Sequence, residues 1–73
     1  MNNINTGDIY LMDNGIIVEI IREFENSPII TVQTLDEIIS WNIYKSEFSF
    51  SIINYLGTNV DVVRLLYGDI YVV

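Results

Sequence analysis

Two segments of this 73-residue chain are apolar on both faces of a two-residue repeat. They are Ile16–Ile21, in which only Glu19 is charged, and Val62–Leu66, in which only Arg64 is charged. A strand of a small antiparallel sheet normally buries one face and exposes the other to water. We therefore expect a second surface, from another copy of the chain or from a partner protein, to cover these two segments.

The small size of the chain also favours association with another copy or a partner. A domain this small buries only about 60% of the surface that its unfolded chain exposes, so it needs disulfides, metals or oligomerisation for stability. The sequence has no cysteine and no histidine, which removes disulfides, the commonest metal ligands and the commonest general base. We predict one domain over residues 1–73, frayed at 1–6, that forms a homo-oligomer and holds no metal or other cofactor.

The formal charge of −7 limits the partners. It repels phosphate backbones and anionic lipid, so we expect neither direct duplex nucleic-acid binding nor membrane binding. No apolar run approaches the roughly 20 residues of a membrane span. Met1–Asp8 lacks the basic and apolar regions of a signal peptide, so we expect a cytoplasmic protein. The acidity serves either solubility or a basic partner.

Alternating apolar residues and turn signals predict several short strands. Asn14-Gly15 stands between two apolar runs and predicts a β-hairpin with a type I′ turn, in which both central residues have positive φ. Within Ile38–Ile43, the side chains of Ile39, Trp41 and Ile43 share the buried face. The predicted strands are Ile9–Met12, Ile16–Phe24, Ile29–Thr34, Ile38–Ile43, Val60–Tyr67 and Ile70–Val73.

Two segments are ambiguous between strand and helix. Ser46–Leu56 has apolar residues at roughly helical spacing and ends at Gly57, so it could form a short helix. Thr58–Asp61 resembles a capping box, but a helix beyond it would have little polar face, so we favour a strand over Val60–Tyr67 with a helix as the alternative. About five or six strands, with at most one short helix, predict an all-β curled antiparallel sheet or small barrel.

A resemblance to a known group supports this fold. The Asn14-Gly15 hairpin follows an opening strand, and a closing apolar segment comes after Gly57. The segments that carry the resemblance are Gly7–Leu11, Ile16–Ile21, Trp41–Ile43, Lys45–Phe48 and Val60–Gly68. Their order resembles small SH3-like barrels and is similar to small uncharacterised proteins of bacteriophages and mobile elements. The resemblance implies an SH3-like barrel and a phage-like origin, and hence the host cytoplasm, but no active site.

The few cations are candidate binding residues. An arginine within an apolar row must find an anion, which is either an acidic side chain of the protein or a bound phosphate or carboxylate. Lys45 follows the aromatic residues Trp41 and Tyr44, which could stack on a ring of a ligand. The position of Trp41 in the alternating pattern, however, favours a place in the core. Tyrosine is enriched at interfaces. The predicted ligand- or partner-binding residues are Arg22, Arg64, Lys45, Tyr44, Trp41 and Tyr10. The predicted oligomer interface consists of Ile17, Ile21, Val63, Leu65, Ile70 and Val72.

The distribution of the acidic residues argues against catalysis. The 10 acids are spread along the chain and form neither an EF-hand loop nor a distinctive carboxylate pair, and the glycines form no phosphate loop. We therefore predict a binding protein of phage or mobile-element type, not an enzyme, that inhibits or sequesters a host defence protein. The alternatives are a homo-oligomeric sponge for a small anionic signalling nucleotide, a structural subunit of a larger particle, and a DNA-mimic inhibitor.

Overall fold

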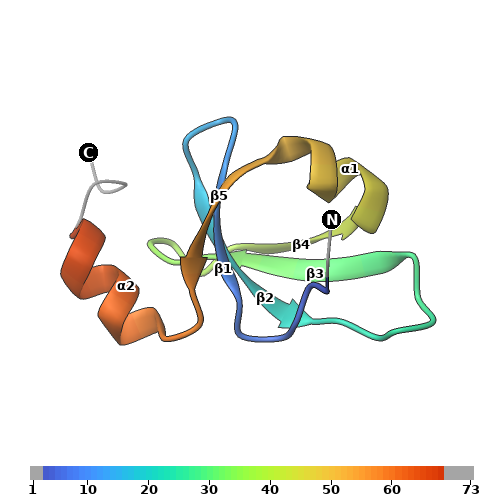
Figure 1. Cartoon of the computed structure of the whole chain (residues 1–73), viewed down its shortest axis with the longest axis horizontal. Coiled ribbons are helices and arrows are strands. Elements are labelled where there is room, and N and C mark those ends of the chain that lie inside the picture. The colour runs from blue at the N-terminus through green and yellow to red at the C-terminus, as the bar shows by residue number, and fades with distance from the viewer. Residues whose placement is uncertain (1–2, 69–73) are drawn as a thin grey trace.

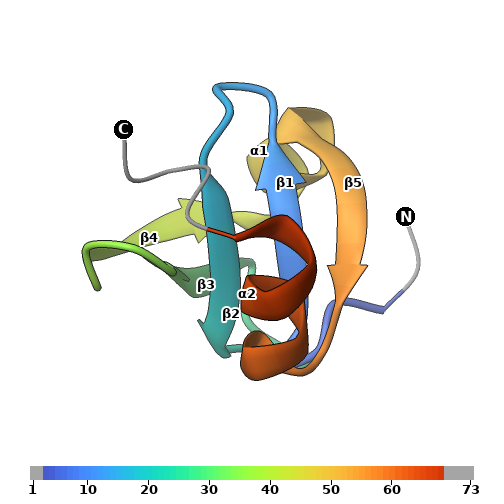
Figure 2. The same cartoon turned by 90° about the vertical axis from the view of Figure 1, so that its left-hand side faces the viewer.

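The fold is a curled, five-stranded antiparallel sheet with two short helices. The computed structural model describes residues 3–68. The strands are β1 (Ile9–Met12), β2 (Ile17–Arg22), β3 (Ile29–Thr34), β4 (Ser40–Tyr44) and β5 (Ile52–Gly57), in the order β4-β3-β2-β1-β5. Helices α1 (Lys45–Ser51) and α2 (Val60–Tyr67) lie on opposite sides of the sheet (Figure 1, Figure 2). The prediction of a small all-β curled sheet is confirmed. Within residues 3–68, no helix has the length and apolarity needed to cross a membrane.

The β1–β2 hairpin forms as predicted, with Ile9 opposite Glu19 and Leu11 opposite Ile17. Its turn is not the predicted type I′. Gly15 has φ of 85°, but Asn14 does not have positive φ. The backbone N–H of Gly15 donates to the Met12 carbonyl at 2.9 Å, and that of Met12 donates to the Ile16 carbonyl at 2.9 Å. This is a three-residue loop closed by one left-handed glycine, which requires positive φ at a single position.

The sheet has an apolar cluster on each face. The inner cluster is covered by α1 and consists of Tyr10, Met12, Val18, Ile20, Ile30, Val32 and Phe48. The outer cluster is covered by α2 and consists of Ile9, Ile17, Leu35 and Val63. Successive residues of β1 and β2 therefore belong to different clusters, because side chains alternate across a strand. Of the two-sided apolar pattern of Ile16–Ile21, Ile17 is buried in the outer cluster and Val18 and Ile20 in the inner cluster of the same chain, whereas Ile16 and Ile21 stay exposed.

Helix α2 is the main correction to the sequence interpretation, which favoured a strand over Val60–Tyr67. The Asn59 side-chain oxygen accepts hydrogen bonds from the backbone N–H groups of Asp61 and Val62, at 2.9 and 3.1 Å, and so caps the first turn. Val63 enters the outer cluster, and Val60 and Tyr67 pack against it. These three residues recur at helical spacing, so packing of one helical face outweighs the weak helix propensity of valine.

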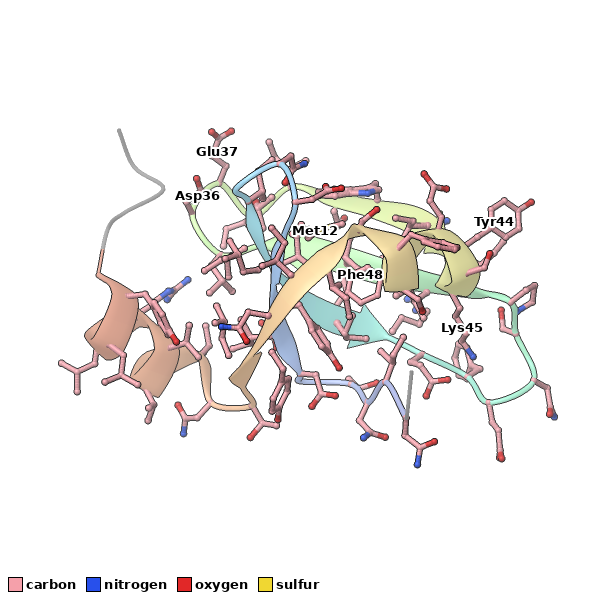
Figure 3. All side chains as sticks on the ribbon, turned by 45° about the horizontal axis from the view of Figure 1, so that its top comes forward. Met12, Asp36, Glu37, Tyr44, Lys45 and Phe48 are labelled. Carbon is pink, nitrogen blue, oxygen red and sulfur yellow. The ribbon has the colours of Figure 1, made fainter. Side chains whose placement is uncertain are left out.

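The ambiguous segment Ser46–Leu56 divides into a helix and a strand. Phe48 of α1 is fully buried, and its ring meets the Tyr10 ring edge to face, with centroids 5.3 Å apart. Figure 3 shows Phe48 turned inward from α1, whereas Tyr44, just before the helix, is turned outward. The second half forms β5, which pairs with β1 and places Tyr55 opposite Tyr10. It is an edge strand of the sheet.

Strand β4 begins two residues later than the predicted strand Ile38–Ile43. Ile38 has φ of 57°, which is strained for a β-branched residue and interrupts the extended backbone. Ile39 is consequently exposed, whereas Trp41 and Ile43 pack against the inner cluster as predicted. The predicted strand Ile70–Val73 lies outside the described residues.

Candidate functional site

Two of the three predicted cationic binding residues, Lys45 and Arg64, already donate hydrogen bonds within the protein. The Lys45 ammonium contacts the Glu23 carboxylate at 2.9 Å and donates to the Phe24 carbonyl at 2.7 Å. The Arg64 guanidinium donates to the Leu35 carbonyl at 2.8 Å and thereby ties α2 to the loop after β3. Arg22 is exposed at the end of β2, and within residues 3–68 its side chain makes no hydrogen bond or ion pair.

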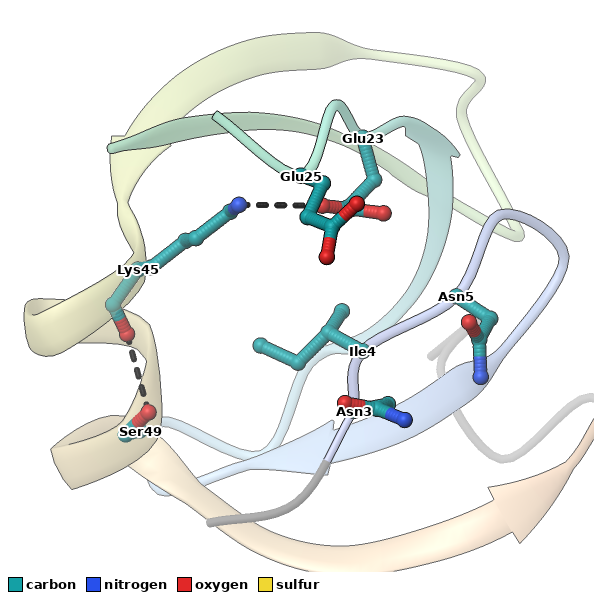
Figure 4. A pocket seen from close by; sticks show the side chains of 7 residues that line it. All are labelled: Asn3, Ile4, Asn5, Glu23, Glu25, Lys45 and Ser49. Atoms are coloured by element: carbon teal, nitrogen blue, oxygen red, sulfur yellow. Dashed lines mark hydrogen bonds and ion pairs between the residues drawn. The ribbon is translucent and has the colours of Figure 1, made fainter. Parts of the chain in front are cut away.

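Lys45 lines a polar hollow of about 440 Å³. Figure 4 shows its ammonium directed toward Glu23, with the Ser49 hydroxyl bound to the Lys45 carbonyl. The lining residues are Asn3, Ile4, Asn5, Glu23, Glu25, Lys45 and Ser49. Because two carboxylates face one ammonium and neither arginine lines the hollow, its charge does not suit a phosphate.

A second hollow of about 560 Å³, the β5 groove, runs between the N-terminal segment and β5. Its lining residues are Asn3, Asn5, Asp8, Tyr10, Ile52, Ile53, Asn54, Tyr55 and Thr58. Asp8 is only 5% exposed. Its Oδ2 accepts hydrogen bonds from the Asn5 backbone N–H at 2.9 Å and, at a longer 3.4 Å, from the Tyr10 hydroxyl. The Tyr10 and Tyr55 rings lie beside each other with centroids 5.3 Å apart.

The environment of Tyr10 predicts a late tyrosine titration. Burial raises the pKa of Tyr10 to about 12, and the charge of Asp8 and the hydrogen bond to it act in the same direction. The pKa of an unfolded tyrosine is about 10, so the neutral phenol stabilises the fold below pH 10, and this contribution is lost as the pH rises through 12. Absorbance at 295 nm should show a phase near pH 12 that Tyr10→Phe lacks. Identical curves for the two proteins above pH 11 would contradict this placement.

The outward side of α2 is apolar. Val62, Leu65 and Leu66 share this side, at positions three and four apart, and are 48%, 83% and 68% exposed. We call these three residues the α2 outer surface. Asp61 is exposed in the first turn of the helix. Asp36 and Glu37, in the loop bound by Arg64, lie at the same end of the molecule as α2 (Figure 3). The surface is thus an apolar patch with acidic neighbours.

The predicted interface and binding residues do not form one surface in the structure. Ile17 and Val63 belong to the outer cluster and are 2% and 1% exposed, so they offer no surface to a second copy. Ile21 and Leu65 are exposed, as is Tyr44, whereas Ile70 and Val72 lie outside the described residues. Trp41 is half-buried against the inner cluster. Tyr10 is in the core but reaches the β5 groove, and Lys45 lines the other hollow.

The sequence interpretation missed Asp8 and Tyr55. Asp8 was not among the predicted binding residues, although Asp8 and Tyr10 share strand parity and therefore the same face. Tyr55 joins them through the pairing of β5 with β1, which was not predicted. In residues 3–68, no three His, Cys, Asp or Glu side chains gather as a metal ion requires. No protein family, curated protein or solved structure matches this chain.

Proposed function

We propose that this protein acts by binding another protein through the α2 outer surface. The proposal rests on the exposure of Leu65 and Leu66, which lie together on α2 and are 83% and 68% exposed. The opposite side of this helix packs against the outer cluster. Clustered large apolar side chains on a small domain mark interaction sites, whereas scattered ones need no explanation. Phe50 is equally apolar and exposed but lies on α1, on the other side of the sheet.

The charge of the chain indicates the chemistry of the partner. A formal charge of −7, with Asp61, Asp36 and Glu37 near α2, favours an apolar surface bordered by lysine and arginine. A second copy of the chain would bring the same acidic neighbours together, with Arg64 of α2 as a partial offset. A different, basic partner therefore fits this surface better than self-association does, although the homo-oligomer predicted from the sequence can use the same residues.

The more specific proposal is that binding inhibits or sequesters a host protein on behalf of a phage or mobile element. It is supported by the resemblance, in the order of its sequence segments, to small SH3-like phage proteins and by the absence of cysteine and histidine from the sequence. A domain that works by occupying its partner needs a complementary surface and no reacting group.

The proposal predicts that Leu65→Gln together with Leu66→Gln abolishes binding. Glutamine has nearly the same helix propensity as leucine, and both side chains are exposed, so the fold should be retained. Losing two buried leucines at an interface should weaken binding at least about a hundredfold. Tagged wild-type protein, the double variant and Phe50→Gln would be purified from the cells that naturally make the protein and weighed by native mass spectrometry.

We expect a stoichiometric partner with wild type and Phe50→Gln but not with the double variant. Masses at multiples of the mass of the tagged chain, present for wild type and lost in the double variant, would instead assign the surface to a homo-oligomer. A partner retained equally by all three proteins would refute the role of the α2 outer surface. Mass lost on denaturation that matches a nucleotide would favour the sponge alternative.

A further inference from the structure

The β5 groove contains a buried carboxylate oxygen that the protein does not use. Asp8 is 5% exposed, and both hydrogen bonds to its side chain reach Oδ2. Within residues 3–68, Oδ1 accepts no hydrogen bond, although Asp8 lines the groove. Buried polar oxygens are nearly always paired, because an unpaired one costs free energy. Because Asp8 lines the groove, its unpaired carboxylate oxygen indicates a place for a donor from outside.

The rest of the lining suits a cation with an apolar stem. Tyr55 is half-exposed, and its ring lies beside that of Tyr10, while Ile52 and Ile53 supply aliphatic surface. Among residues 3–68, no lysine or arginine lines the groove, so no cationic side chain of the described residues competes for Asp8 there. Tyrosine faces attract cations, and a planar guanidinium stacks on them better than an ammonium does.

We propose that the β5 groove binds the guanidinium of an arginine side chain on a partner polypeptide. The guanidinium donates to Asp8 Oδ1 and lies against the Tyr55 ring, and its alkyl stem lies along Ile53. The formal charge of −7 attracts such a partner over a distance. The groove and the α2 outer surface share no residue, so a test of this site is independent of a test of the proposed function.

A pair of tripeptides tests the proposal directly. The probes are acetyl-Gly-Arg-Gly-amide and acetyl-Gly-citrulline-Gly-amide, which differ by the charge of the side chain and little in its shape. Titration into the 15N-labelled full chain, followed by amide chemical shifts, gives both affinity and location. We expect the arginine peptide to bind with a millimolar Kd and to shift Asn54, Tyr55 and Thr58, and the citrulline peptide to bind at least about tenfold more weakly.

Two variants and a matched control assign the residues. Asp8→Asn removes the charge but keeps an oxygen for the Asn5 N–H, and it should weaken arginine binding at least about tenfold. Tyr55→Leu removes the ring and should weaken binding several-fold, which tests the site even if Asp8→Asn fails to fold. Tyr44→Leu, at an equally exposed tyrosine outside the groove, should change nothing.

Three results would overturn the proposal. They are equal binding of the citrulline peptide, shifts centred on Glu23 and Glu25 of the polar hollow, or no shifts at peptide concentrations of tens of millimolar.

Discussion

Phe48→Ala is expected to lower the free energy of unfolding by about 3 to 5 kcal/mol, the usual cost of truncating a fully buried phenylalanine. Phe48 is 0% exposed and is the residue of α1 that enters the inner cluster, where it meets the Tyr10 ring. A 73-residue domain has a total stability of roughly 4 to 11 kcal/mol, so this change removes much or all of it. Urea unfolding followed by Trp41 fluorescence measures the loss.

The matched control is Phe50→Ala, two residues further along the same helix. Phe50 is 91% exposed, so its truncation should change the free energy of unfolding by no more than about 0.5 kcal/mol. A loss below 1 kcal/mol for Phe48→Ala would mean that α1 does not cover the inner face of the sheet. If Phe48→Ala is unfolded without urea, Phe48→Leu should show a smaller, measurable loss in the same direction.

The sheet was predictable because its signals are local. Apolar runs of four to six residues separated by Asn14-Gly15 and Ser27-Pro28 mark β1, β2 and β3. The structure places β1 and β3 within the predicted bounds, whereas β2 begins one residue later and ends two residues earlier than the predicted strand Ile16–Phe24. The hairpin turn was less predictable. Asn-Gly favours a two-residue loop, but including Asp13 gives a three-residue loop that a single glycine can close.

Helix α2 was not predictable from periodicity alone. Val60, Val62 and Val63 favour a strand, and the helical face formed by Val60, Val63 and Tyr67 is recognisable only once the sheet provides a surface for it. The cap at Asn59 was the signal that favoured a helix. The homo-oligomer was predicted from the same interpretation and stays a prediction. With Val60–Tyr67 as a strand, the second apolar face of Ile16–Ile21 would have no cover within the chain.

The β5 groove depends on contacts distant in sequence. Asp8 and Tyr55 are separated by most of the chain and meet because β5 pairs with β1 at the end of the fold. Neither residue forms a motif with its neighbours in sequence. The α2 outer surface was partly visible, since Leu65 was among the predicted interface residues, but its assignment to one side of a helix required the structure.

Val63→Asp should detach α2 from the sheet and cost at least about 4 kcal/mol, because it places a charge without a partner in the outer cluster. Val63 is 1% exposed and packs with Ile9, Ile17 and Leu35. Without α2, these three side chains face water on one side of an otherwise folded sheet. We therefore expect the variant to self-associate, as measured by size-exclusion chromatography with light scattering, and to unfold at lower urea than wild type.

Val62→Asp is the matched control, because it makes the same change one residue earlier in the same helix. Val62 is half-exposed, and an acidic residue in the first helical turn interacts favourably with the helix dipole, so stability and mass should stay close to wild type. Equal stability of the two variants would show that α2 does not cover the outer face. That face would then be free for a second copy of the chain, and the two-sided pattern of Ile16–Ile21 would again require an oligomer.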